Sequence, residues 1–363
     1  MAEVSKLIFF LFISIFFFYF SIYFGAPTRT SSSYITWKDI LVEDDDVKHS
    51  LTWRDGGNVI VVSKDGRGDS RTVQGAVDLI PHSNTRRIKI FILPGVYREK
   101  VLVPRYKPRV SFIAANPNSS TVISWNSKAS DPSSNGLGGV VGTYDSASVA
   151  VESDYFTASH ITFENTSPEA PPGSVGLQAV ALRVTGDKAV FYRCRILGSQ
   201  DTLFDHIGRH LFYQCYIRGN IDFIFGSARS LYKECTIHST AKTIGAIAAS
   251  QRNSSRDIGG FIFSHCRVKG SGKVYLGRAW GRFSTVIFGF CEIDCVIIPE
   301  GWNDWGDPTR RETTLFAEYS CTGGGADQSR RVPWMKTFTH RQITPFLSRR
   351  YIDNDRNHRW LRI

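Results

Sequence analysis

The chain has 363 residues, with 44 Lys and Arg against 33 Asp and Glu, and a formal net charge of +11. Its hydrophobic content of 42%, with only 21% charged residues, excludes a disordered chain and predicts a packed core. The basic excess favours a polyanionic partner, which would be a nucleic acid, an anionic membrane surface or an acidic polysaccharide.

The first residues of the chain indicate its compartment. Residues 7–26 form an almost uninterrupted apolar run behind Lys6. This pattern is typical of a signal peptide or a signal anchor over residues 1–26, and we favour a cleaved signal peptide. The rest of the chain then enters the secretory pathway. Three glycosylation sequons fit that compartment, at Asn118, Asn165 and Asn253.

The chain after the apolar run is predicted to hold one large domain. Residues 27–57 include an acidic run at 43–46 and little periodicity, so we interpret them as a linker or a capping arm. No later Pro-, Gly- or Ser-rich stretch is long enough to separate two domains, although the length alone permits two or three. Residues 58–363 are therefore expected to fold together.

A repeat is visible in the cysteines. Five of the seven begin a C-x-[IV] triplet, and successive triplets are 21, 20, 31 and 25 residues apart: Cys194, Cys215, Cys235, Cys266 and Cys291. Each follows a short, aromatic, β-prone run, without helical periodicity between runs. This pattern predicts a solenoid, and a parallel β-helix is its natural form, because like residues then stack on rungs about 4.8 Å apart.

The stacked cysteines have two interpretations. As small apolar side chains they would fill an inward ladder, which is the expectation for Cys194 and Cys266. Stacked rungs in an oxidising compartment also permit disulfides, for which Cys215 with Cys235 is the preferred pair. An odd number of cysteines leaves at least one thiol free or intermolecular. The spacings His206-x3-His210 and Cys291-x3-Cys295 resemble metal sites but supply no full ligand set, so no metal is predicted.

Two carboxylates occupy equivalent positions on consecutive rungs. Asp201 and Asp222 each lie seven residues after the cysteine of their own rung, Cys194 and Cys215. Two carboxylates stacked this closely should titrate as a coupled pair, one serving as an acid and the other as a nucleophile or base. The alternative is a structural ladder of Asp, Asn and Gln that satisfies turn backbone.

Two glutamines accompany the carboxylates. Gln178 and Gln200 are 22 residues apart, about one rung. Their amide N–H groups could stabilise an oxyanion that develops on an attacked carbonyl. An acid, a nucleophile and two neutral donors form a set suited to acyl transfer without serine or metal.

Longer motifs contain these residues. The blocks Gly95-Val-Tyr-Arg-Glu-Lys, Gln178-Ala-Val-Ala-Leu-Arg, Gln200-Asp-Thr-Leu, Asp222-Phe-Ile-Phe-Gly and Leu276-Gly-Arg-Ala-Trp resemble the five signature regions of plant pectin methylesterases, in the same order. The resemblance covers about residues 58–350. It implies an all-β fold, the right-handed single-stranded parallel β-helix, in agreement with the repeat. The chain resembles the short form of the family, which lacks an inhibitor-like pro-domain.

The resemblance assigns roles that spacing left open. It implies that Asp222 is the nucleophile and that Asp201 is the general acid, which then acts as the base. Gln178 and Gln200 would donate to the oxyanion, and Gln178 would also touch substrate.

Three further residues are matched to substrate binding and orientation. Arg278 would pair with Asp222, Trp280 would lie along a sugar ring, and Thr143 would contact substrate. Ala279 stands where the family usually has proline, and residues 167–176 form a longer loop than usual. These departures affect the expected shape of the cleft, while every catalytic group is present.

The leading hypothesis is a secreted, extracellular cell-wall enzyme that hydrolyses methyl esters of galacturonan without a cofactor. Its expected partners are pectin and a proteinaceous pectinesterase inhibitor, and a monomer is expected. One rival is a polygalacturonase or lyase on the same scaffold, which would need other acidic residues or calcium ligands. Another is a non-catalytic wall-binding protein. Secretion argues against nucleic-acid binding.

The excess positive charge is concentrated near the C-terminus. Residues 330–363 contain nine Lys and Arg against two Asp, a balance of +7. This basic tail is hypothesised to hold the enzyme against de-esterified, anionic pectin.

Overall fold

The computed structural model describes residues 34–41, 58–133, 138–169, 175–294, 296–354 and 359–363. The predicted signal peptide or anchor lies outside these residues. Residues from Tyr34 to Ile363 belong to one compact unit. Within the described part, no helix is long and apolar enough to cross a membrane.

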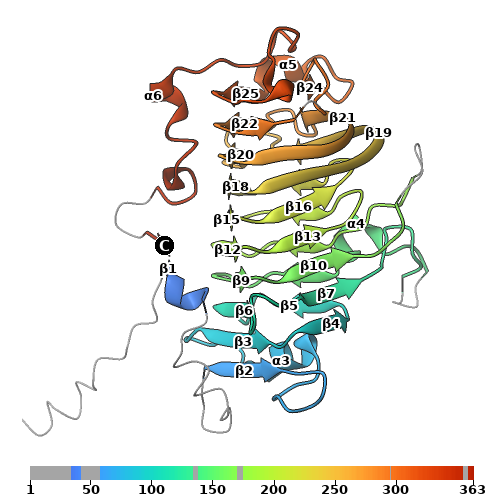
Figure 1. Cartoon of the computed structure of the whole chain (residues 1–363), viewed down its shortest axis with the longest axis vertical. Coiled ribbons are helices and arrows are strands. Elements are labelled where there is room, and N and C mark those ends of the chain that lie inside the picture. Colours follow the sequence, from blue (N-terminus) through green and yellow to red (C-terminus); the bar gives the residue numbers. More distant parts are fainter. Residues whose placement is uncertain (1–33, 42–57, 134–137, 170–174, 295, 355–358) are drawn as a thin grey trace, which may run out of the picture. The chain divides into compact units, whose positions relative to one another are not determined.

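Short parallel strands wind into a right-handed β-helix, as predicted (Figure 1). One wall is a sheet of in-register strands, each from a successive coil: β2 (Val59–Val62), β3 (Ile88–Ile92), β6 (Val110–Ala114), β9 (Thr157–Ser159), β12 (Ala189–Tyr192), β15 (Arg209–Tyr213), β18 (Arg229–Lys233), β20 (Gly260–Ser264), β22 (Thr285–Gly289) and β25 (Leu315–Tyr319).

Two further walls complete each coil. The first contains β4 (Gly95–Arg98), β7 (Thr121–Trp125), β10 (Thr162–Asn165), β13 (Arg195–Leu197) and β16 (Tyr216–Gly219). The second contains β5 (Val101–Val103), β8 (Val149–Val151), β11 (Leu182–Val184), β14 (Leu203–Asp205) and β17 (Ile224–Gly226). Both walls join the long strand β19 (Thr236–Ser250), which pairs with β21 (Arg267–Arg278) and, through it, with β23 (Glu292–Ile293) and β24 (Trp302–Asn303).

Short helices lie at the ends and turns of the solenoid. They are α3 (Val73–Leu79), α4 (Gly142–Asp145), α5 (Arg310–Thr313), α6 (His340–Ile343) and the 3₁₀ turns Trp37–Asp39, Gly324–Ala326 and Arg349–Tyr351. Helix α3 begins at Thr72, whose hydroxyl accepts a hydrogen bond from Gly75 N at 3.0 Å. Its buried residues Val73, Ala76 and Val77 cover the first coil.

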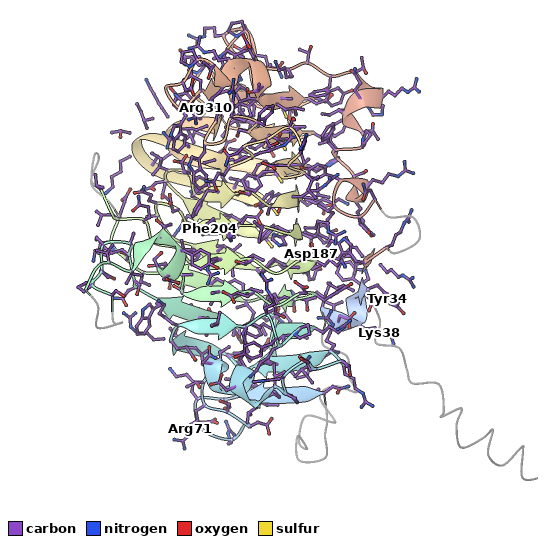
Figure 2. The ribbon with its side chains drawn as sticks, turned by 180° about the vertical axis from the view of Figure 1, so that it is seen from behind. Tyr34, Lys38, Arg71, Asp187, Phe204 and Arg310 are labelled. Atoms are coloured by element: carbon purple, nitrogen blue, oxygen red, sulfur yellow. The ribbon has the colours of Figure 1, made fainter. Side chains whose placement is uncertain are left out.

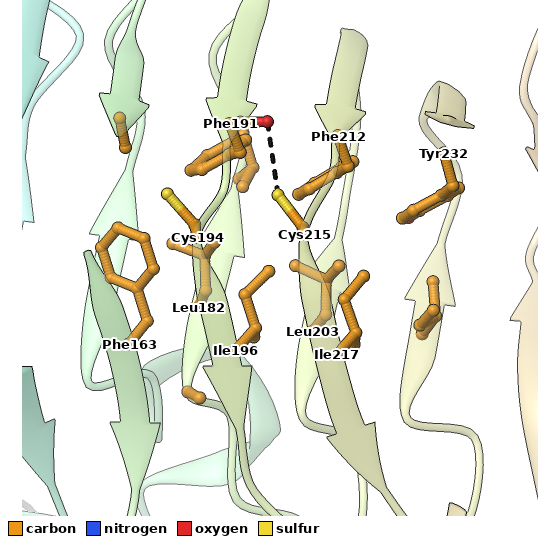
Figure 3. Close-up of a cluster of buried hydrophobic side chains, with 14 of the residues drawn as sticks. Phe163, Leu182, Phe191, Cys194, Ile196, Leu203, Phe212, Cys215, Ile217 and Tyr232 are labelled. Carbon is orange, nitrogen blue, oxygen red and sulfur yellow. Dashed lines mark hydrogen bonds between the residues drawn. The ribbon is translucent and has the colours of Figure 1, made fainter. Parts of the chain in front are cut away.

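The interior is a stack of aromatic rings (Figure 3). Phe191, Phe212, Tyr232, Phe263 and Phe288 come from successive coils, with ring centroids 4.9, 4.8, 4.6 and 4.3 Å apart. All five side chains are fully buried. Because the strands are in register, one aromatic position per coil suffices to build a continuous core.

The predicted cysteine ladder lies beside this stack. Cys194 and Cys266 are buried, as the apolar interpretation expects. The predicted Cys215–Cys235 disulfide is wrong, because both thiols are free. Instead, Cys215 Sγ donates to the carbonyl of Phe191 (Figure 3), and Cys235 Sγ donates to the carbonyl of Phe212, each at 3.3 Å. In-register parallel strands keep Cβ atoms about 4.8 Å apart, whereas a disulfide needs about 3.8 Å and converging Cβ vectors.

The corner before each of these cysteines has a left-handed backbone. The residues at this corner have φ between 48° and 55°: Arg193, Gln214, Glu234, His265, Phe290 and Ser320. The last of these precedes Cys321, which extends the ladder although it does not begin a C-x-[IV] triplet. Non-glycine residues adopt this conformation only where the surrounding structure imposes it. The regular corner is therefore a product of stacking.

Both termini of the compact unit pack on the outside of the β2–β25 wall. Strand β1 (Ile35–Thr36) pairs in parallel with β26 (Leu361–Arg362). Of the predicted linker or capping arm, Tyr34–Leu41 is described, and its residues Ile35 and Ile40 are fully buried. This segment is an arm bound to the β-helix.

The structure bears on two predictions about the surface. Asn165 is 4% exposed, and its amide donates to the carbonyls of Ser127, Ser146 and Val180, so its sequon cannot carry a glycan in this fold. The basic tail is also less free than its composition suggests. The side chain of Arg331 is only 3% exposed, and it pairs with Glu318 at 2.6 Å.

Candidate active site

A cleft of about 540 Å³ lies on the outer face of the wall formed by β8, β11, β14, β17 and the end of β19. It contains all seven residues that the sequence predicted for the site: Thr143, Gln178, Gln200, Asp201, Asp222, Arg278 and Trp280. These residues come from five different coils. Five of them precede the strands β8, β11, β14 and β17, whereas Arg278 ends β21 and Trp280 follows it.

The two aspartates occupy equivalent places on adjacent coils. Leu203 pairs with Ile224, so Asp201 and Asp222 each stand two residues before a paired position. Asp201 N also donates to Ile221 O at 3.3 Å. Both aspartates have positive φ, 59° and 47°. Aspartate tolerates this conformation better than most residues, and such strain is concentrated at functional sites.

The carboxylate of Asp222 is held by Arg278. Arg278 Nε donates to Asp222 Oδ1 at 2.9 Å, and Arg278 Nη2 donates to Asp222 Oδ2. The guanidinium also lies 4.0 Å from the ring centroid of Trp305. Asp222 is 7% exposed, so this bidentate pair fixes both carboxylate oxygens in a largely dehydrated place.

Asp201 has a different electrostatic environment. Burial in the cleft floor and the neighbouring Asp222 carboxylate raise the pKa of Asp201 well above its usual value, and Arg278 only partly opposes this. Burial and a like charge both disfavour ionisation. The site therefore contains one carboxylate paired with a cation and one that favours its protonated form.

The glutamines differ slightly from the expected register. Leu182 pairs with Leu203, so Gln178 stands four residues before the paired position and Gln200 stands three before it. Both nevertheless line the cleft, and Ala179 N donates to Gln200 O at 3.2 Å. Within the described residues, neither side-chain amide has a protein partner. Both amides are free to donate to a bound molecule.

Aromatic rings form the walls of the cleft. Phe204 and Phe225 stack at 4.3 Å, and Trp280 stacks with Trp305 at 6.5 Å. Tyr144, next to Thr143 in α4, packs on the Arg183 guanidinium at 3.6 Å. Flat apolar faces beside polar donors suit a sugar chain, which presents C–H groups on its ring faces and hydroxyls at its edges.

Six residues of the cleft were not predicted as site residues from the sequence: Tyr144, Phe204, Phe225, Ala249, Gln251 and Trp305. Phe225 could have been found, because it follows Phe204 by 21 residues, the same interval that separates Asp201 from Asp222. Gln251 and Trp305 have no such partner. The turns that carry them differ in length from coil to coil.

The two histidines with metal-like spacing have structural roles. His210 is fully buried, and its Nδ1 lies 2.5 Å from Asp205 Oδ1. The other carboxylate oxygen of Asp205 accepts from the Tyr232 hydroxyl at 2.6 Å. His206 packs against Phe204 and Tyr144 at the edge of the cleft. The two side chains have different partners, and within the described residues no group of three or more His, Cys, Asp or Glu is placed to hold a metal ion.

With this geometry established, the chain can be compared with known proteins. Residues 59–355 match the family model Pectinesterase. The chain belongs to the pectinesterase family. Among curated pectinesterases, it is 52% identical over 350 residues to Pectinesterase QRT1 of Arabidopsis thaliana, covering 91% of this chain and 90% of the relative. The enzymes of this family are carboxylic ester hydrolases.

Solved pectinesterase structures share the fold. The pectin methylesterase from carrot superposes with a TM-score of 0.73 at 34% identity, over 81% of this chain and 92% of the carrot chain. The pectin methylesterase from Aspergillus niger superposes with a TM-score of 0.70 at 27% identity, over 84% and 97% of the two chains. The predicted family and β-helix are thus confirmed.

Proposed function

We propose that this pectinesterase hydrolyses the C6 methyl esters of galacturonan, with Asp222 as the nucleophile and Asp201 as the acid and base. The observation that carries this proposal is the contrast between the two carboxylates. Asp222 forms a bidentate ion pair with Arg278, whereas burial and the Asp222 carboxylate raise the pKa of Asp201 well above its usual value. Acyl transfer requires one group of each kind within reach of one carbonyl.

The reaction begins when a carboxylate oxygen of Asp222 attacks the ester carbonyl carbon. The carbonyl oxygen becomes an oxyanion, which accepts hydrogen bonds from the amides of Gln178 and Gln200. Collapse breaks the bond to the methoxy oxygen, and Asp201 gives its proton to that oxygen, which releases methanol. The sugar then remains bound to Asp222 as an acyl-enzyme.

Water completes the cycle. Asp201, now ionised, takes a proton from water as the oxygen of that water attacks the acyl carbonyl. The bond to Asp222 breaks, the galacturonate carboxyl is released, and Asp201 again carries its proton. When the acyl bond breaks, Asp222 leaves as a carboxylate, which Arg278 stabilises through its two hydrogen bonds. The rings of Trp280 and Trp305 support the sugar chain.

The experiment is to measure methanol release and chain shortening on the same methylated galacturonan. Methanol without shortening is expected, and shortening would support a lyase or polygalacturonase instead. Asp222→Asn and Asp201→Asn should each lower kcat by at least about 100-fold, the effect typical of a lost nucleophile or general acid. Asp78→Asn, on the exposed face of α3, is the matched control. Binding of pectin with no methanol release by the wild type would support the non-catalytic rival.

The location and partners remain proposals supported by the relatives. The apolar run at residues 7–26 supports secretion to the cell wall, which fractionation of the tagged full chain tests. Asn118 and Asn253 are exposed and fit a glycosylated, secreted protein. We also expect a monomer in solution and a protein inhibitor that covers the cleft, which size-exclusion chromatography with and without a pectinesterase inhibitor would detect.

A further inference from the structure

A second hollow, of about 690 Å³, lies beside the catalytic cleft. It occupies the turns that lead from the catalytic wall to the strands β15, β18 and β20. Gln251 lines both the hollow and the catalytic cleft, so the two are adjacent. Four arginines line this second hollow, here called the arginine groove: Arg209, Arg229, Arg252 and Arg256.

The arginine groove carries more positive than negative charge. Its acidic residues are Asp187 and Asp257. Asp187, labelled in Figure 2, pairs with Arg209 through bonds of 3.0 and 2.5 Å. Asp257 accepts from the backbone N–H groups of Asn253 and Ser254 at 3.0 and 2.9 Å, so its carboxylate closes a turn. The remaining arginines have no carboxylate partner within the described residues.

Neutral groups hold two of these three arginines in place. Arg252 donates to the carbonyls of Asp257 and Ser255 and to the Thr285 hydroxyl. Arg229 donates its Nε–H to Tyr351 O and lies 4.5 Å from the centroid of that ring. These contacts fix the guanidinium groups without neutralising them. Positioned, uncompensated guanidinium groups are suited to binding carboxylates.

The cations also crowd one another. Burial, together with the neighbouring Arg209 and Arg252, lowers the pKa of Arg229. A bound anion would relieve this repulsion.

The rim of the groove adds exposed aliphatic side chains, with Ile207 at 41% and Ile258 at 66% exposure. A ligand with regularly placed carboxylates and apolar ring faces matches this combination.

We propose that the arginine groove binds the de-esterified stretch of a galacturonan chain, whose free carboxylates are the product of the neighbouring cleft. This proposal rests on the proposed function, which makes an anionic chain beside Gln251. A chain held there keeps its hydrolysed part bound while its esterified part remains near Asp222. The anionic partner suggested by the net charge thus binds next to the active site, at arginines that lie outside the basic tail.

The test is binding of a de-esterified oligogalacturonate, measured by calorimetry at physiological salt. Because the Asn253 sequon lies on the groove, the protein is first treated with a glycosidase. Arg256→Gln should weaken binding roughly two- to fivefold, as expected for one exposed ion pair. Arg256→Glu should weaken it further, and the Arg229→Gln/Arg256→Gln pair by roughly tenfold. Arg256 is exposed and makes no side-chain contact on which the fold depends, so its variants remain informative if Arg229→Gln unfolds.

The matched control is Arg71→Gln, which makes the same charge change near the N-terminal end of the solenoid, away from the groove (Figure 2). It should leave binding unchanged, because charges beyond a Debye length are screened. Unchanged binding in both Arg256 variants would overturn the proposal. An equal loss of polyglutamate binding would overturn the uronate assignment, since it would indicate a surface for any polyanion. Wild-type methanol release is measured separately, so failure of the proposed function is distinguishable from failure of the groove.

Discussion

The pairing of Arg278 with Asp222 predicts the effect of a conservative substitution. Arg278→Lys keeps the positive charge but replaces a planar fork with a single ammonium group. Lysine cannot donate to Oδ1 and Oδ2 of Asp222 in parallel, nor can it stack on Trp305 as the guanidinium does at 4.0 Å. Asp222 would stay paired but lose its fixed orientation toward the ester.

The expected size follows from these contacts. One lost hydrogen bond to a charged group is worth about 1.5–3 kcal/mol, and the lost stacking about 0.5–1 kcal/mol. If the whole of this loss, about 2–4 kcal/mol, falls on the transition state, it lowers kcat by roughly 30- to 900-fold. The affinity for substrate should change little, because Arg278 acts through Asp222.

The assay is the kcat and KM of methanol release from methylated galacturonan, with thermal melting to show that the variant is folded. Arg282→Lys is the matched control, since Arg282 is exposed and has no carboxylate partner within the described residues. A folded Arg278→Lys enzyme whose kcat is within about threefold of the wild type would refute the claim that bidentate orientation of Asp222 limits the reaction.

Three further predictions concern stability. Burial and the Asp222 carboxylate raise the pKa of Asp201 above the usual 3.8, so the ionised form of Asp201 destabilises the folded state as pH rises. Asp201→Asn should therefore have a higher free energy of unfolding than the wild type near neutral pH. Urea titrations should show that this gain vanishes below about pH 3.8, where Asp201 is protonated in both states. Phe212→Ala should lose about 3–5 kcal/mol of unfolding free energy, because it opens the aromatic stack, and a loss below about 1 kcal/mol in urea unfolding would contradict this. Asn165→Ala should lose about 1–3 kcal/mol through unsatisfied carbonyls, whereas Asn118→Gln should not, and a glycan found on Asn165 by peptide mapping would be incompatible with the structure.

Much of the candidate site was predictable because a β-helix converts sequence spacing into spatial neighbourhood. Asp201 and Asp222 share one offset from their cysteines, so equal spacing placed them on adjacent coils. The resemblance to a family then added Arg278, Trp280 and Thr143, which no spacing connects to the aspartates. In-register stacking follows from the repeat alone, since any other register would leave apolar positions exposed.

Tertiary structure decided the features that depend on lateral contacts and on turn geometry. The sequence could not show that Cys215 and Cys235 remain thiols. That outcome depends on the parallel Cβ vectors of stacked coils, which do not converge as a disulfide requires. Nor could it show that Asn165 is buried, since its sequon is also compatible with an exposed turn. The arginine groove comes from three turns of different length, at Arg209, Arg229 and 251–259.

The opening charge of +11 illustrates the same division. Composition determined that an anionic partner was to be expected, but not which cations would meet it. Arg331 belongs to the basic tail and yet is neutralised by Glu318, whereas Arg229 and Arg252 gather beside the active site without a carboxylate partner within the described residues. A count of charges along a chain cannot distinguish these cases, because neutralisation depends on which side chains folding brings within a few ångströms.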